Sequence, residues 1–177
     1  MTIARTEIRP ETEADIAAIR EVTDEAFATA EHSSGTEALI VERLRERGKL
    51  SLSLVAEQEG VVRGHVAFSP VTIDGQSSGW FGLGPVSVSP RWQNRGIGEA
   101  LIREGLKRLE ETGGSGCVLL GYPAYYSRFG FAHHRQLSMQ GLPEEHAANF
   151  MAIAFEGDVP QGSVVFDEAF EVSADEV

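Results

Sequence analysis

The sequence predicts that the chain folds as one α/β domain over residues 1–177. A length of 177 residues suits a single full-sized core, and 42% hydrophobic with 24% charged residues is typical of a globular chain. Strand-like runs alternate with amphipathic helical patterns along it. No internal repeat, low-complexity linker or change of composition divides the sequence.

The N-terminal part predicts one strand and two helices. Residues 3–9 alternate as in a strand that ends at Pro10, and Thr12 with Asp15 forms a capping box at the start of a helix. One face of that helix carries Ile16, Ile19, Thr23, Ala26 and Phe27. After a loop at 30–35, a second helix over 36–47 ends before Gly48.

The next segment predicts a hairpin and a further strand. Residues 50–57 and 61–73 read as two strands around the turn "QEG", and residues 80–88 form the strand that follows. Pro85 lies within this last strand. Because proline cannot donate a ladder hydrogen bond, we expect irregular or edge pairing there.

The clearest amphipathic helix begins near Gly96 and ends at Gly113-Gly114. Its apolar face carries Gly98, Leu101, Ile102, Gly105, Leu106 and Leu109. The apolar run 116–122 is typical of a strand buried on both faces, and Cys117 within it is expected to be a small buried hydrophobe. A short helical turn leading to another strand then follows at 123–131, and residues 150–157 and 162–170 supply two more strand-like runs.

Charge and composition exclude several classes of function. The net charge of −12 argues against a nucleic-acid partner. It would suit a cationic acceptor, but a compositional habit or a role in solubility explains it better, so it indicates little about the substrate. No apolar run is long enough to cross a membrane, and no secretory signal pattern is present. With Cys117 as the only cysteine, we expect a cytoplasmic protein without disulfides. No histidine or carboxylate set has metal-ligand spacing, so no metal is expected.

The stretch "RWQNRGIGEALI" at 91–102 predicts an anion-binding turn. A strand, a short loop and a helix opened by glycines leave unpaired N–H groups at the positive end of the helix dipole. Gly96 and Gly98 let an anion approach these amides, and Arg95 with Arg91 adds positive charge. The pattern favours a diphosphate. Neither a nucleotide-hydrolase P-loop nor a Gly-x-Gly-x-x-Gly fingerprint is present.

Two motifs resemble those of the GNAT acetyltransferase superfamily. "QNRGIG" at 93–98 matches its Gln/Arg-x-x-Gly-x-Gly/Ala signature, and "YYSRFGF" at 125–131 resembles its second signature, a tyrosine four residues before Gly-Phe. The resemblance covers about residues 3–135, with a signature core at about 60–135, and it is strongest to the YhbS-like bacterial subgroup. It implies a mixed, mostly antiparallel sheet that splays between the fourth and fifth strands, with helices on both faces. Residues 136–177 would add C-terminal strands and an acidic tail.

The resemblance also implies a cosubstrate, acetyl-CoA, and the residues that hold it. The backbone of Val86, Ser87 and Val88 would pair with the pantetheine arm, and the turn would bind the pyrophosphate. The turn residues carried over in this way are Gln93, Asn94, Arg95, Gly96, Ile97 and Gly98. Tyr126 aligns with the family's general acid, whereas Tyr125 is expected to be structural and Tyr122 is a weaker substitute.

The general base is left open by the sequence. Many family members place a carboxylate on the fourth strand, but residues 81–88 contain none. Glu37, His65 and His32 are substitutes, and a chain of water molecules would serve equally well. His133 and His134 are expected at the surface.

Two functions from different classes follow from the resemblance. The first is an N-acetyltransferase that moves an acetyl group from acetyl-CoA to the primary amine of a small molecule or a protein. The second is a non-catalytic acyl-CoA-binding regulatory module. Retention of Tyr126 favours the enzyme. Family members commonly dimerise, so a homodimer is compatible with either function.

Overall fold

The computed structural model describes residues 5–30 and 33–172. The strands are β1 (Thr6–Pro10), β2 (Leu52–Gln58), β3 (Val61–Ile73), β4 (Gln76–Val88), β5 (Gly116–Leu120), β6 (Leu137–Met139), β7 (Phe150–Ala154) and β8 (Gly162–Val165). The α-helices are α1 (Ile16–Phe27), α2 (Glu37–Glu46), α3 (Ile97–Glu111) and α4 (Pro123–Tyr126). Short 3-10 turns connect several of them.

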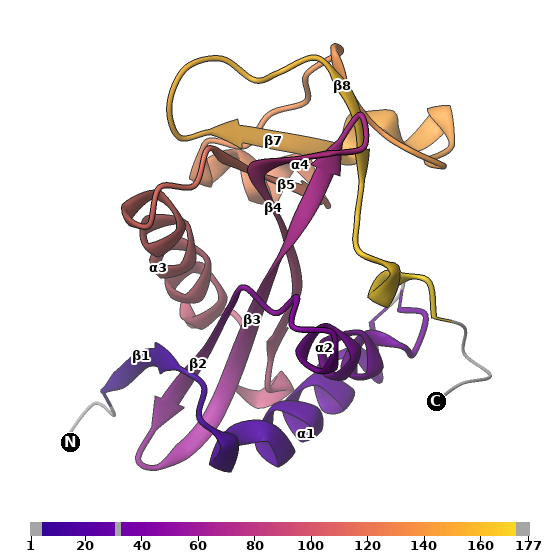
Figure 1. Cartoon of the computed structure of the whole chain (residues 1–177). Coiled ribbons are helices and arrows are strands. Elements are labelled where there is room, and N and C mark those ends of the chain that lie inside the picture. Colours follow the sequence, from indigo (N-terminus) through magenta and orange to yellow (C-terminus); the bar gives the residue numbers. More distant parts are fainter. Residues whose placement is uncertain (1–4, 31–32, 173–177) are drawn as a thin grey trace.

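The strands form one mixed sheet in the order β1-β2-β3-β4-β5-β7 (Figure 1). Along this path every neighbouring pair is antiparallel except the parallel pair of β4 and β5. The short strand β8 pairs with the far end of β3 and with β6. The mixed, mostly antiparallel sheet implied by the family resemblance is therefore confirmed.

The strands β4 and β5 separate after a short contact. They pair only over Trp80–Gly82 and Gly116–Val118, although β4 continues to Val88. In the same region β4 is bulged, since Gly84 and Pro85 lie between the pairs Phe68–Leu83 and Val66–Val86. Both the splay and the irregular pairing at Pro85 were expected from the sequence. The outcome is a stretch of β4 whose β5-facing edge lacks a partner strand among the described residues.

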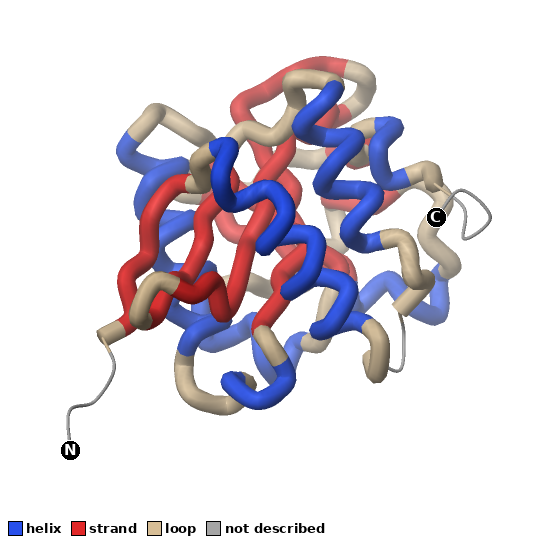
Figure 2. Tube along the Cα trace, turned by 90° about the horizontal axis from the view of Figure 1, so that it is seen from below, coloured by secondary structure: helices blue, strands red, loops and turns tan. Residues whose placement is uncertain are grey.

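Helices cover both faces of the sheet. The amphipathic helix α3 packs across β1, β2 and β3 on one face, whereas α1 packs on β3 and β4 on the other, beside α2 (Figure 1). Seen from below, helices lie on both sides of the strands (Figure 2). One face of the splayed strands β4 and β5 therefore contacts α3, whereas the other face of β4 contacts α1.

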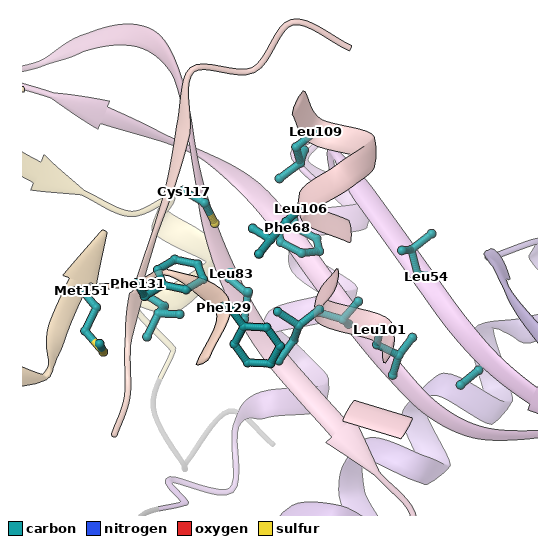
Figure 3. Close-up of a cluster of buried hydrophobic side chains, with 14 of the residues drawn as sticks. Leu54, Phe68, Leu83, Leu101, Leu106, Leu109, Cys117, Phe129, Phe131 and Met151 are labelled. Carbon is teal, nitrogen blue, oxygen red and sulfur yellow. The ribbon is translucent and has the colours of Figure 1, made fainter. Parts of the chain in front are cut away.

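The main core lies between α3 and the sheet, and much of it is shown in Figure 3. Leu106 of α3 lies next to Phe68 of β3 in this view, and Leu101 and Leu109 belong to the same cluster. Cys117 is buried in the same cluster, as expected, and burial raises the pKa of its thiol. A second, smaller apolar cluster on the opposite face is built around β5, β7 and β8.

The N-terminal capping pair is present and has an additional partner. The amide and hydroxyl of Thr12 both donate to Oδ2 of Asp15. Arg9 of β1 donates to both oxygens of the same carboxylate and to Glu57 of β2. The guanidinium of Arg9 holds the pKa of Asp15 well below its usual range. These contacts fix the start of α1 against the edge of the sheet.

Three predicted strand boundaries were wrong. Strand β4 begins at Gln76 rather than at 80, because Asp74 and Gly75 adopt positive φ and close a tight hairpin with β3. The run 166–170 is not a strand, since Asp167 accepts the N–H of Ala169 and caps a 3-10 turn. Strand β5 ends at Leu120 rather than at 122.

We expect Gly105→Ala to destabilise the fold. A β-carbon at this position of α3 would overlap the ring of Phe68, so helix and sheet would have to separate locally. Overpacking of this kind costs about 1–3 kcal/mol of unfolding free energy, measurable by chemical denaturation. Gly98→Ala in the same helix is the control, because its β-carbon would meet its neighbours at an ordinary 3.6 Å. Equal stability of the two variants would contradict this packing.

Candidate functional site

The loop that leaves β4 turns sharply into α3. The N–H of Ser89 donates to the carbonyl of Arg63 at 2.8 Å, and Pro90–Trp92 form a 3-10 turn. Asn94 and Gly96 then adopt positive φ angles of 62° and 86°. Asparagine and glycine tolerate this left-handed backbone better than other residues. Gly96 caps α3, one residue from where the sequence placed the helix start.

The first amides of α3 have no acceptor. The first hydrogen bond of the helix runs from the N–H of Ala100 to the carbonyl of Gly96 at 3.0 Å. The N–H groups of Ile97, Gly98 and Glu99 therefore have no backbone or side-chain partner within the described part of the chain. Together with the helix dipole, they form a site suited to a phosphate group.

These amides open into a cleft of about 420 Å³. Its lining residues come from the end of β4, the turn, the start of α3, α4 and the 3-10 turn after α4: Val88, Trp92, Gln93, Asn94, Gly96, Ile97, Gly98, Glu99, Tyr125 and Arg128. The hydroxyl of Tyr125 lies 3.6 Å from where a β-carbon on Gly98 would be. Tyr125, expected to be structural, thus faces the turn across the cleft.

Three arginines stack on the aromatic walls of this cleft. The guanidinium groups of Arg63 and Arg95 lie 4.5 Å and 4.9 Å from the ring centroid of Trp92. Arg128 lies 4.4 Å from the ring of Tyr125, and its Nε donates to the carbonyl of that residue at 2.9 Å. Of these three arginines only Arg128 lines the cleft, where the carboxylate of Glu99 lies in the same lining.

Four lining residues were not predicted from the sequence: Trp92, Glu99, Tyr125 and Arg128. Arg128 lies within the "YYSRFGF" motif, so its charge next to the aromatic pair was the available signal. Arg95 was expected at the phosphates, but its guanidinium stacks on Trp92 and does not line the cleft. The fold brings the other predicted turn residues together around one opening.

Two predicted binding residues also have structural partners. Nε2 of Gln93 donates to the carbonyl of Val88 at 3.0 Å and so ties the turn to the end of β4. The buried hydroxyl of Ser87 donates to Oγ1 of Thr23 in α1 at 3.3 Å. The side chains of Val86 and Val88 pack on the opposite side, against the α3 core. Adjacent residues of β4 thus face the two sides of the sheet.

Tyr126 lies beside the cleft, packed among other aromatic rings. Its ring centroid lies 4.9 Å from that of Tyr125 and 6.3 Å from that of Phe131, in edge-on arrangements. The ring also covers the α-carbon of Gly121, where any β-carbon would overlap it. Burial raises the pKa of Tyr126 to about 12, so its phenol stays protonated at neutral pH.

A family model described as an acetyltransferase (GNAT) domain matches residues 7–134. The chain belongs to the GNAT acetyltransferase family. It is similar to an uncharacterized N-acetyltransferase, YhbS, of Escherichia coli strain K12, with 45% identity over 114 residues that cover 62% of this chain and 68% of that protein. This relationship agrees with the YhbS-like subgroup implied by the motifs.

Two solved GNAT structures resemble the whole fold. A GNAT family acetyltransferase from Brucella melitensis in complex with acetyl-CoA is 48% identical, with a TM-score of 0.84, and the match covers 95% of this chain and 99% of that chain. Escherichia coli YhbS in complex with CoA is 34% identical, with a TM-score of 0.88 and coverage of 97% and 95%. The chain is thus a GNAT-type N-acetyltransferase by family.

The candidate general bases of this GNAT chain differ in their surroundings. Glu37 at the start of α2 accepts a hydrogen bond from Ser33 and is partly exposed. His65 is fully buried on β3, with its Nε2 2.8 Å from Oγ of Ser53 and its Nδ1 without a partner within the described residues. Because it has no access to solvent, His65 is poorly placed to take a proton from a substrate. His32 lies outside the described residues.

Two further observations concern the described residues only. Within them, no three histidine, cysteine or carboxylate side chains are grouped so that they could hold a metal ion. None of their helices is both long and apolar enough to span a membrane.

The buried imidazole predicts a pH dependence of stability. Burial, with a smaller effect of the Arg45 charge, lowers the pKa of His65 from 6.5 to about 3. Between these values the unfolded chain binds a proton that the folded chain does not, so the free energy of unfolding falls as the pH is lowered. We expect His65→Gln to reduce this slope by up to about 1.4 kcal/mol per pH unit, measured by denaturation between pH 4 and 6.5.

His146→Gln serves as the control, because this side chain is mostly exposed. Its slope should match that of the wild type. If His65→Gln left the slope of unfolding free energy against pH unchanged, the His65 imidazole would have to titrate in the same pH range in the folded and unfolded chains.

Proposed function

We propose that this GNAT chain transfers an acetyl group from acetyl-CoA to a primary amine by direct attack. The single observation that supports this best is the set of unpaired amides at the start of α3, which open into a cleft. They would hold the pyrophosphate, with Asn94 and Gly96 shaping the turn. Solved relatives bound to acetyl-CoA or CoA support the choice of cosubstrate.

The pantetheine arm would lie along β4 where it leaves β5. Beyond Gly82 this edge of β4 has no partner strand within the described residues, so backbone groups from Val86 to Val88 are available to an extended ligand. The carbonyl of Val88 is the exception, because it already accepts from Gln93. Val86 and Ser87 would therefore carry most of this pairing.

Tyr126 would supply the proton that the departing sulfur needs. When bound, acetyl-CoA supplies an acetyl carbon activated as a thioester. The amine nitrogen forms a bond to that carbon as the carbon–sulfur bond breaks, and the phenol of Tyr126 gives its proton to the sulfur. The amine proton passes to water, which later returns a proton to the phenolate. A protonated phenol at neutral pH suits this role.

A non-catalytic acyl-CoA-binding module is the second candidate. It is favoured by the lack of a carboxylate on β4, where many family members have one. The two functions differ in one observable. An enzyme releases CoA thiol at a rate that depends on the added amine, whereas a module binds CoA without turnover.

We expect Tyr126→Phe to lower kcat about 100-fold while the KM for acetyl-CoA changes little, because a general acid acts on the chemical step. Thiol release over a panel of amines measures both constants. Tyr125→Phe is the matched control, since its hydroxyl faces Gly98 and should affect acetyl-CoA binding instead. If Tyr125→Phe lowered kcat and Tyr126→Phe did not, the general acid would be Tyr125 and not Tyr126.

We expect Gly98→Asp to weaken CoA binding at least tenfold more than Gly98→Asn, about 1.4 kcal/mol. The two side chains have nearly the same shape, but only aspartate places a negative charge among the free amides of α3. Calorimetric titration with CoA measures both affinities, and circular dichroism checks the fold. Equal affinities of the two variants for CoA would show that the phosphates do not bind at this turn.

A further inference from the structure

We propose that Phe166 closes one face of the gap between β4 and β5 and so keeps water away from the acetyl thioester. The residue follows β8 in the chain and lies far from both sequence motifs. This inference rests on the proposed acetyl transfer and names a side chain that protects the transfer from hydrolysis.

The ring of Phe166 lies directly on the backbone of β4 at Gly82. A β-carbon on Gly82 would overlap Cε1 and Cδ1 of this ring, so only glycine leaves room for it. Gly82 pairs with Val118 at the last paired position of β4 and β5, before the two strands separate. Phe166 therefore lies where the gap between the strands begins.

The ring covers the face of the sheet opposite α3. Side chains alternate along β4, and Leu83, next to Gly82, belongs to the α3 core. Phe166 packs instead against the second apolar cluster, which contains Val118. The narrow end of the gap thus has an apolar side chain on each face, Leu83 on one and Phe166 on the other.

The sheet beneath the ring is closed to solvent. Ser69 of β3 pairs with Gly82, so its side chain lies on the same face as the ring. Ser69 is fully buried, and its hydroxyl has no hydrogen-bond partner within the described residues. Val71, two residues farther along β3, is buried beside it. Because Phe166 itself is only partly buried, its ring separates this dry surface from the solvent.

Both neighbours of Phe166 in the chain are anchored. On one side, Val165 pairs with Thr72 of β3. On the other, Nε of Arg47 in α2 donates to Oδ1 of Asp167 at 2.8 Å. Figure 1 shows the segment after β8 running to a short turn beside α2. The ring is therefore held on β4 from both ends.

The turn that follows adds an apolar anchor on α2. Ala169 is fully buried in a cluster with Ile40 and Leu44, and Phe170 packs against the same cluster. The rings of Phe166 and Phe170 lie 5.3 Å apart. The same segment thus places one ring on β4 and a second ring on α2, and the second provides a matched control.

Water competes with the amine for the same carbon. When water attacks, its oxygen bonds to the acetyl carbon as the carbon–sulfur bond breaks, and the phenol of Tyr126 gives its proton to the sulfur. One proton of the water passes to the solvent, which returns a proton to the phenolate, so the products are acetic acid and CoA. Enzymes suppress such side reactions by excluding water from the reacting groups. The ring of Phe166 excludes water and offers it no polar partner.

The test measures the CoA thiol released from acetyl-CoA with no amine present. We expect this hydrolysis to rise about tenfold in Phe166→Ala, because water then enters the gap. Phe166→Leu keeps an apolar side chain over Gly82 and should stay within about twofold of the wild type. Phe170→Ala removes a ring from the same segment but uncovers α2, so its hydrolysis should also match the wild type. Calorimetric titration with CoA checks that each variant retains the cofactor cleft.

A second readout uses the panel of amines. In the wild type, the acetylated amine formed should equal the thiol released. In Phe166→Ala the thiol should exceed the acetylated amine, because part of the acetyl group passes to water. A loss of stability alone would lower both quantities together and would leave their ratio unchanged.

The outcomes separate this inference from the proposed function. Hydrolysis at the wild-type rate in folded Phe166→Ala, or an equal rise in Phe166→Leu or Phe170→Ala, would overturn the inference and leave the transferase intact. Because hydrolysis needs no acceptor, the assay still decides the inference when no amine is acetylated, and only the proposed transfer then fails. If circular dichroism shows that Phe166→Ala does not fold, Gly82→Ala decides. Its β-carbon would displace the ring and should raise hydrolysis, and no rise would overturn the inference.

Discussion

The separation of β4 from β5 after Gly82 is the constraint on which the rest of the molecule depends. It leaves one edge of β4 without a partner strand in the described fold and lets the chain turn directly from Val88 into α3. The amides at the start of that helix then open into the cleft rather than into a neighbouring strand.

The position of α3 is set by glycines that allow close approach to the sheet. A β-carbon on Gly64 of β3 would lie 3.0 Å from Ile97 and 3.1 Å from Leu101, so this strand meets the first turns of the helix at contact distance. Farther along, Gly105 admits the ring of Phe68. Packing at both points aims the helix N-terminus at the end of β4. A site that needs fixed amides therefore depends on residues that never touch the ligand.

Sequence reasoning predicted the parts of the fold that carry strong local signals. The spacing of Leu101, Leu106 and Leu109 predicted α3, and the glycines of 93–98 predicted its exposed N-terminus. The sequence did not predict which side chains of the turn face the cleft, because Trp92, on which Arg95 stacks, also contacts Arg63 of β3, a residue distant in sequence. The direction of Tyr125 and the surroundings of His65 likewise follow from tertiary packing that no local pattern encodes.

A crystal structure of this chain with bound CoA tests the central claim most directly. The account predicts that the pyrophosphate oxygens accept hydrogen bonds from the amides of the turn and the start of α3. It also predicts that the sulfur lies between β4 and β5, within reach of the Tyr126 hydroxyl. Density that places the pyrophosphate away from the helix N-terminus, with those amides still unpaired, would contradict it.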